Sequence, residues 1–281
     1  MDALQWLVKG TLVVFVVSSM LSIGLAVRRA EVAAPLQSPL WILRALIANF
    51  VLAPVAALSI GIVLSIDPGY ELGLLLLGFA AGTPLLPKLA EAGRADVASA
   101  TALMVLLMAA SVVIMPLALP LFVKGVQVNP WQIAAPLVVL MLAPLALGMA
   151  ARSLAPRIGA RLLPVLTKTS NIGFVAVVLL ICGTNLTALA AVLGSGAIGA
   201  AMLFVVLLFA GAWALGEPHS AGRRLLGYAT AGRNVGAALV TAGASGAEPK
   251  ATVMLIVTGV VGLVSLLAVT TWVRRRAAPA A

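Results

Sequence analysis

One apolar segment of the chain reads Gly227-Tyr-Ala-Thr-Ala-Gly-Arg-Asn-Val-Gly-Ala-Ala-Leu-Val-Thr-Ala242 and carries an arginine beside an asparagine near its centre. A guanidinium at membrane depth costs about 2.5 to 3.5 kcal/mol on insertion scales. A charge retained at such a cost is a functional-site candidate, and a fixed positive charge suits an anionic ligand. Arg233 and Asn234 are therefore our first candidate binding residues.

The composition of the whole chain is that of an integral membrane protein. Its 281 residues are 63% hydrophobic and only 9% charged, whereas soluble domains carry about 25% charged residues. The apolar runs are continuous and about 20 residues long, which indicates helices and not the alternating strands of a barrel. We therefore expect an all-α polytopic protein in the lipid bilayer, with residues 1–281 forming a single membrane unit.

Apolar segments and charged turns alternate along the chain. Arginines concentrate in the turns after the odd-numbered segments and in the C-terminal tail, whereas the turns after the even-numbered segments carry none. Because positive residues accumulate in cytoplasmic loops, this pattern predicts an outside N-terminus and a cytoplasmic C-terminus, in what we expect to be the bacterial inner membrane. We count nine segments, at about residues 4–27, 41–66, 70–90, 97–123, 130–151, 162–186, 190–215, 222–244 and 251–273.

The charge distribution and the rare residue types argue against several functions. The net charge of +10 comes from arginines at many segment ends, such as Arg28 and Arg29, and forms no single patch, so we expect no nucleic-acid partner. The only histidine, His219, falls in a predicted turn, and the only cysteine, Cys182, falls inside a segment. We therefore expect no enzyme activity, no metal ion and no cofactor.

Two of the nine segments, at residues 70–90 and 222–244, are interrupted. The first contains Gly78-Phe-Ala-Ala-Gly-Thr-Pro-Leu-Leu-Pro-Lys88, and its two prolines cannot continue a regular helix because each lacks an amide donor. The second has three glycines around Arg233. Interrupted segments in both halves of a chain are typical of a transporter site between inverted repeats. Close packing of helices through glycines spaced four apart is the alternative.

These segments resemble the bile acid:sodium symporter family (the BASS or SBF-like proteins) over most of the chain. The resemblance implies a nine-helix member with a panel domain and a core domain. In the core, two discontinuous helices, here residues 70–90 and 222–244, cross at the membrane centre. The motifs that carry the resemblance are Gly82-Thr83-Pro84-Leu85-Leu86-Pro87 with Asp96-Val97-Ala98, Ser22-Ile23-Gly24-Leu25, Asn49-Phe50 with Pro54, and Arg233-Asn234-Val235-Gly236.

The chain departs from that family where its sodium-coupled members hold two cations with oxygen ligands. The resemblance puts the corresponding positions on or near apolar residues and on an arginine. At a separation of ~4 Å and an effective dielectric of ~20, a guanidinium would repel sodium by roughly 4 kcal/mol. The resemblance therefore implies a divergent member without the usual sodium ligands, whose positions fall on Leu85, Leu86 and Arg233 and near Ala100, Met104 and Ala229.

We interpret the chain as a secondary transporter that moves a small organic anion, such as a carboxylate, by alternating access. Sodium-independent uniport or exchange is our first hypothesis. A sodium-coupled symporter is one alternative, and a non-transporting membrane receptor or assembly protein is another. Arg233 would neutralise the anion or brace the crossing, and the structural alternative is an ion pair with Asp96, Glu91 or Glu71.

Site residues follow from the two interrupted segments and from polar residues elsewhere in apolar surroundings. The substrate-binding candidates are Gly82, Thr83, Pro84, Arg233 and Asn234. Further candidates for the cavity wall, with interhelical hydrogen bonding as the alternative for those in the sixth segment, are Asn49, Thr101, Asn171, Asn185 and Thr230.

Overall fold

A computed structural model describes residues 3–27, 38–122, 129–216 and 220–276. Every regular element in these ranges is helical, as predicted, and they contain no strand. Arg28 and Arg29, at the end of the first apolar segment, and His219, in a predicted turn, lie outside the described residues. The all-α fold class is therefore confirmed for the described part of the chain.

Seven helices in the described ranges are long and apolar enough to cross a membrane, and each lies in one of the predicted apolar segments. Two of them contain one π-helical turn each. Each of these two helices therefore consists of three consecutive elements, an α-helix, a π-helical turn and a second α-helix. In chain order the elements are α1 (Ala3–Ala26), α3 (Pro39–Ile47) with η2 (Ala48–Leu52) and α4 (Ala53–Leu64), α7 (Val97–Phe122), α8 (Pro130–Leu137) with η3 (Val138–Leu142) and α9 (Ala143–Leu154), α10 (Pro156–Thr184), α12 (Ala197–Leu215) and α15 (Pro249–Arg276).

The two segments that the sequence marks as interrupted are each split into a pair of shorter helices. The first pair is α5 (Pro68–Phe79) and α6 (Leu86–Ala92), and the second is α13 (Ser220–Ala231) and α14 (Val235–Ser245). A further short helix, α11 (Leu186–Val192), joins α10 to α12. The breaks fall at residues 80–85 and 232–234, where the prolines and glycines had predicted them.

Local sequence explains where several helices begin. A short polar residue followed by proline precedes α3, α5 and α8, and in each case the polar side chain accepts a hydrogen bond from the first turn. Asp67 accepts from the Gly69 amide at 2.9 Å, and Asn129 accepts from the Trp131 amide at 2.9 Å. The polar side chain satisfies a free amide of the first turn. Proline is tolerated at the first helical position because an amide there would have no partner within the helix.

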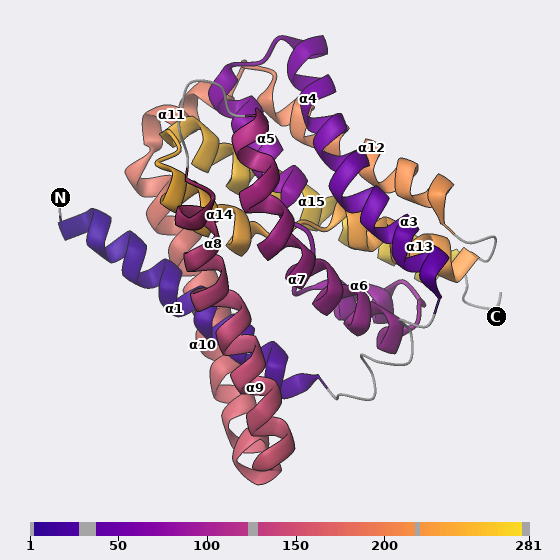
Figure 1. Cartoon of the computed structure of the whole chain (residues 1–281). Helices are drawn as coiled ribbons and strands as arrows, with labels where there is room; N and C mark the ends of the chain where they lie inside the picture. The colour runs from indigo at the N-terminus through magenta and orange to yellow at the C-terminus, as the bar shows by residue number, and fades with distance from the viewer. Residues whose placement is uncertain (1–2, 28–37, 123–128, 217–219, 277–281) are drawn as a thin grey trace.

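The helices pack in two groups around the broken pairs (Figure 1). Helix α1 lies against α9 and α10, α12 lies against α4 and α13, and α5 and α15 pack between these groups. The backbones of α1 and α9 approach closely, because a Cβ added at Gly24 would lie 2.3 Å from the Leu145 carbonyl oxygen. Paired small residues at Gly24 and Gly148 allow this approach of two backbones.

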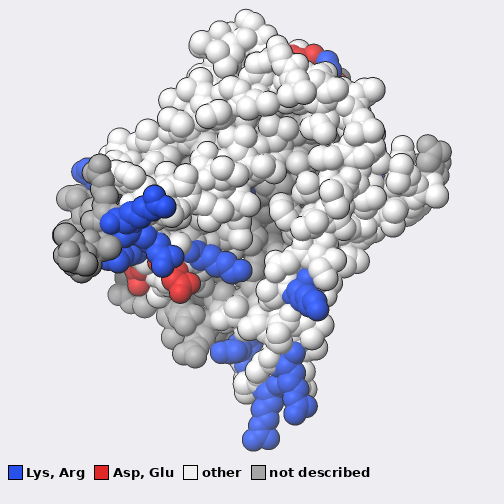
Figure 2. Space-filling view, turned by 180° about the vertical axis from the view of Figure 1, so that it is seen from behind, with Lys and Arg blue, Asp and Glu red and all other residues white. Residues whose placement is uncertain are grey.

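The surface of the molecule is largely apolar, as a bilayer-embedded protein requires. Large side chains such as Ile62, Leu121 and Leu154 are more than three-quarters exposed. Figure 2 shows lysines and arginines gathered toward one end of this face, a small charged group at the other end and a broad uncharged zone between them. This distribution fits a protein whose middle zone contacts lipid acyl chains.

Candidate functional site

The two broken segments meet through their unwound residues. The Asn234 amide donates to the Ala80 carbonyl at 2.9 Å, and the Asn234 side-chain Nδ2 donates to the Gly82 carbonyl at 3.1 Å. The Asn234 Oδ1 accepts from the Ala237 amide at 3.0 Å and so caps α14. One asparagine therefore joins the first break to the start of the helix after the second break.

Gly82 occupies a position in the first break that only glycine fits. Its φ of +79° lies in the left-handed region, and an added Cβ would lie 2.6 Å from the Met108 amide nitrogen and 2.9 Å from the Met104 carbonyl oxygen. Helix α7 also holds the break through Ser111, whose hydroxyl accepts from the Ala81 amide at 2.8 Å. The break is thus supported by α7 on one side and by Asn234 on the other.

The guanidinium of Arg233 lies beside the point where the two breaks meet, which we call the crossing. All of its N–H groups are hydrogen-bonded. Its Nε donates to the Leu77 carbonyl at 2.8 Å, and its Nη2 donates to the carbonyls of Gly78 at 2.6 Å and Asn49 at 3.4 Å. Its Nη1 donates to the Asn49 Oδ1 at 2.8 Å and to the Thr230 carbonyl at 3.0 Å. These bonds match the five N–H groups of arginine, and none of their acceptors is a carboxylate.

The acceptors explain why a cation belongs at this point. Leu77 and Gly78 lie in the last turn of α5, and Thr230 lies in the last turn of α13. Carbonyl groups at helix C-termini are unsatisfied and carry partial negative charge. One guanidinium therefore neutralises the ends of both half-helices, whose free carbonyls would otherwise be costly in the buried interior.

Asn49 presents its carbonyl to Arg233 because the helix is locally irregular. It lies in the π-helical turn η2, in which hydrogen bonds join residues five apart. The residue five positions after Asn49 is Pro54, which has no N–H to donate. The Asn49 Nδ2 also donates to the Thr230 hydroxyl at 3.2 Å, so η2 is tied to the end of α13.

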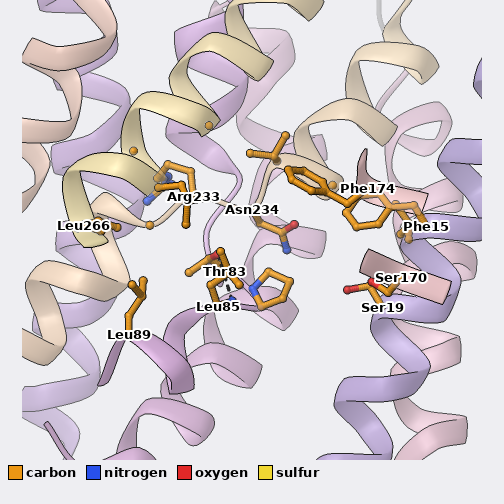
Figure 3. Close-up of a pocket in the computed structure, with 18 of the residues that line it drawn as sticks. Phe15, Ser19, Thr83, Leu85, Leu89, Ser170, Phe174, Arg233, Asn234 and Leu266 are labelled. Atoms are coloured by element: carbon orange, nitrogen blue, oxygen red, sulfur yellow. Dashed lines mark hydrogen bonds between the residues drawn. The ribbon is translucent and has the colours of Figure 1, made fainter. Parts of the chain in front are cut away.

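A pocket of about 300 Å³ opens beside the crossing (Figure 3). The two breaks form one wall, α1 and α10 form the opposite wall, and α15 closes a third side. Its described lining contains no aspartate, glutamate or histidine, and its only charged residue is Arg233. The lining also includes Phe15, Ser19, Thr83, Leu85, Ser170, Asn171, Phe174, Asn234 and Thr258.

The pocket wall is mostly apolar, with hydroxyl groups at separate points. Phe15 and Phe174 form a tilted aromatic pair with ring centroids 5.4 Å apart. The Thr83 hydroxyl accepts a long bond of 3.4 Å from the Leu85 amide, and its own proton has no acceptor among the residues that the structure describes. The Thr258 hydroxyl is buried and has no partner among the described residues. An apolar wall with a few polar groups is typical of a small-molecule site.

The structure brings together five of the ten candidate residues at the pocket. Thr83, Pro84, Arg233, Asn234 and, as an exposed side chain on α10, Asn171 all line it. Gly82 does not line the pocket, although it shapes the break that does.

Four of the candidate cavity residues lie elsewhere, so their assignment to the cavity wall requires correction. Asn49 and Thr230 are bonded to each other in the network behind Arg233. Thr101 donates to the Val97 carbonyl within α7, and Asn185 donates to the Ile181 carbonyl at the end of α10. All four side chains satisfy their own helix or a neighbouring one, as polar groups in an apolar medium must.

Sequence reasoning missed the wall formed by α1, α10 and α15. Ser19, Ser170 and Thr258 line the pocket, but serine and threonine are common in membrane helices and satisfy themselves within their own helix. Ser111 was missed for the same reason. No signal in one sequence separates these hydroxyls from Ser18 or Ser22, which bond to their own helix.

The apolar helices and the pocket beside two broken helices define a membrane protein of the transporter class. A sequence model of the Sodium Bile acid symporter family matches residues 12–192. This match covers more than half of the chain, and the protein therefore belongs to that family. The matched range contains the first break and ends before the second, which holds Arg233. No curated protein matches the chain.

Proposed function

We propose that this protein is a secondary transporter for a small organic anion of the carboxylate type, working by alternating access without sodium. The observation that carries the proposal is the pocket beside the crossing, whose described lining holds one arginine and no acidic residue. A ligand of opposite charge is the one that such a pocket attracts. The Sodium Bile acid symporter family match supports the transporter class.

In this proposal Arg233 attracts the anion electrostatically without touching it, and its hydrogen bonds hold the crossing together. Its five N–H groups already have acceptors, so it offers the substrate no free donor. A unit negative charge about 8 Å away would still gain roughly 2 kcal/mol at an effective dielectric of about 20. The N-terminus of α14, whose residues Asn234, Val235 and Gly236 line the pocket, adds to this positive potential.

Direct contacts to the carboxylate would come from neutral donors. Thr83 lines the pocket, and its hydroxyl proton has no acceptor within the described part of the chain. Charge-assisted bonds of this kind are roughly twice as strong as neutral ones. Gly82 and Pro84 would hold the break in the shape that presents Thr83.

Sodium independence is supported by what surrounds the crossing. Leu86, Ala100, Met104 and Ala229, at or near positions where the family resemblance implies sodium ligands, are all buried and apolar. Leu85, the fifth position, is apolar and lines the pocket. The guanidinium at the sixth position would repel the ion. Uniport or exchange of the anion follows from this.

The alternative that a specific observation favours is sodium-coupled symport, because the matching family is named for it. That alternative needs oxygen ligands from Asn49, Thr101 and Thr230. Each of these side chains already has a hydrogen-bond partner, so a sodium ion would have to displace those bonds. We therefore rank it second.

The proposal includes a membrane arrangement. The seven long helices and the two broken pairs would give nine crossings, with an outside N-terminus and a cytoplasmic C-terminus in a bacterial inner membrane. The broken pairs would form a core domain that rocks against a panel, as inverted-repeat transporters do.

The test is uptake of labelled short-chain carboxylates into proteoliposomes, with and without a sodium gradient. Saturable uptake that is unchanged when potassium replaces sodium is the expected result. Strict sodium dependence would overturn the coupling part of the proposal. An absence of both carboxylate uptake and carboxylate binding would overturn the transport function and favour a non-transporting receptor or assembly protein.

A further inference from the structure

The wall of the pocket opposite the crossing carries two serines that the proposed function does not use. Ser19 on α1 is 6% exposed and Ser170 on α10 is 8% exposed. Figure 3 shows both on the far side of the pocket from Thr83, and each lies one helical turn from a member of the Phe15–Phe174 pair. They come from helices far apart in the sequence and line one pocket only in the folded chain.

Neither hydroxyl makes a hydrogen bond to any part of the chain that the structure describes. This is unusual for buried serines in helices, which normally bond to a carbonyl three or four residues earlier. The neighbouring serines follow the rule: the Ser18 hydroxyl donates to the Val14 carbonyl at 2.6 Å, and the Ser22 hydroxyl donates to the Ser19 carbonyl at 2.8 Å. Ser19 lies between them on the same helix and keeps its hydroxyl free.

Both serines line the pocket, and neither hydroxyl is among the side-chain atoms that are sealed from solvent without a partner. Both hydroxyls are therefore reached from the pocket and can bond a ligand in place of water. Each hydroxyl offers one proton and two lone pairs, so the pair can bind a hydroxyl, a carbonyl or an amide. It carries no charge and would not hold an anion by itself.

We propose that Ser19 and Ser170 form a second polar subsite, which binds a hydroxyl or carbonyl group at the end of the substrate remote from its carboxylate. The inference rests on the proposed function, because the carboxylate end is assigned to the crossing. The Phe15–Phe174 pair and Leu85 lie along the pocket and match an apolar middle section.

The pocket volume favours a small substrate. About 300 Å³ lies at the lower end of the range for small-molecule pockets, which is roughly 300 to 1,000 Å³. The substrate class is therefore a short carboxylic acid with an apolar middle and a neutral hydrogen-bonding group at its far end.

The experiment compares straight-chain carboxylates with their terminally hydroxylated counterparts, from about four to about eight carbons. Binding to the purified full-length protein is measured by calorimetry. For at least one chain length, the wild type should bind the hydroxy acid about tenfold more tightly, as one or two good hydrogen bonds allow. In the double variant Ser19→Ala, Ser170→Ala the preference should reverse, because the hydroxyl then loses its water without gaining a partner.

Ser18→Ala is the matched control, since it removes a hydroxyl from the same helix that is bonded within α1 and should leave the preference unchanged. Each single variant is measured as well, in case the double variant does not fold. If the wild type binds both acids equally at every length, the second subsite is overturned while the anion pocket stands. If the chain binds neither series, the proposed function itself fails.

Discussion

At the scale of single residues, Arg233 satisfies carbonyl groups that the two broken helices would otherwise leave without donors. Two half-helices end in the interior of the protein, and Arg233 bonds to carbonyls in the last turn of each. Arginine suits this place better than lysine because its planar fork reaches several acceptors at once. The same residue therefore serves the fold and sets the sign of charge that the pocket favours.

Arg233→Lys separates these two roles. Lysine keeps the charge but offers three donors in place of five, so at least two acceptors lose a partner. We expect a stability loss of about 2 to 4 kcal/mol in chemical denaturation and a carboxylate affinity within a few-fold of wild type. Arg233→Met should lose both stability and affinity. An Arg233→Lys protein that keeps its stability but no longer binds carboxylates would show that the guanidinium contacts the substrate directly.

Gly82→Ala tests whether the first break needs glycine. A Cβ there meets backbone atoms of α7 at 2.6 and 2.9 Å, and the residue has a positive φ. We expect a loss of about 2 to 4 kcal/mol, measured by denaturation in detergent. Gly199→Ala, in α12 with open space around it, should be neutral or slightly stabilising. Equal effects of the two substitutions would contradict our description of the break.

At the scale of elements, the close pairing of α1 with α9 fixes the position of one pocket wall. Gly24→Ala would push a methyl group against the Leu145 carbonyl, 2.3 Å from the ideal Cβ position. We expect α1 to shift and stability to fall by about 2 kcal/mol or more. The matched control is Gly10→Ala, in the same helix with nothing within 4 Å of the added Cβ.

Because α1 also carries Phe15 and Ser19, Gly24→Ala should weaken carboxylate binding as well, and Gly10→Ala should not. Circular dichroism during heating reports the first effect, and calorimetry reports the second. A Gly24→Ala protein with wild-type melting and binding would disprove the close contact.

The turn between α4 and α5 carries an ion pair that makes stability depend on pH. Lys250 donates to Asp67 at 2.5 Å and the Gly69 amide donates at 2.9 Å, and these bonds hold the pKa of Asp67 below its usual value. Because this pKa is lowered in the folded state, the stabilisation is present above the usual aspartate pKa and is lost as pH falls through the lowered value.

Asp67→Asn should remove this acid-side dependence. Near neutral pH the melting temperature should change by no more than about 2 °C, since the pair is exposed. Scanning the melting temperature of wild type and variant between pH 2 and 7, an interval of about five units around the aspartate pKa, tests this. Glu91→Gln, which makes the same change of charge at the end of α6, is the control. Parallel pH profiles for wild type and Asp67→Asn would contradict the expectation.

At the scale of the whole molecule, the predicted orientation can be tested with thiol labelling. In a Cys182→Ser background, Glu248→Cys places a thiol in the turn before α15, and Arg157→Cys places one at the start of α10. A membrane-impermeant maleimide added to intact cells should label the first thiol only, because the arginine-bearing turns are predicted to be cytoplasmic. Labelling of Arg157→Cys alone would invert the topology.

Much of the architecture could be predicted from the sequence because its signals are local. Continuous apolar runs predicted the seven long helices of the described ranges, and prolines and glycines predicted the two breaks. Within the predicted site, Thr83, Arg233 and Asn234 line the pocket, since each belongs to a break. Asn49, Thr101, Thr230 and Asn185 do not, because polarity in an apolar segment does not tell which way a side chain faces.

The sequence by itself determined that this chain is a membrane-embedded helical protein with two interrupted spans and an arginine at one interruption, because hydropathy and backbone breakers act along the chain. Only the tertiary structure decided which carbonyls Arg233 satisfies and that Ser19 and Ser170 share a wall. The physical reason is that many of these helices are apolar on every side. Their rotation is therefore set by packing against distant helices, and no periodic pattern in the sequence records it.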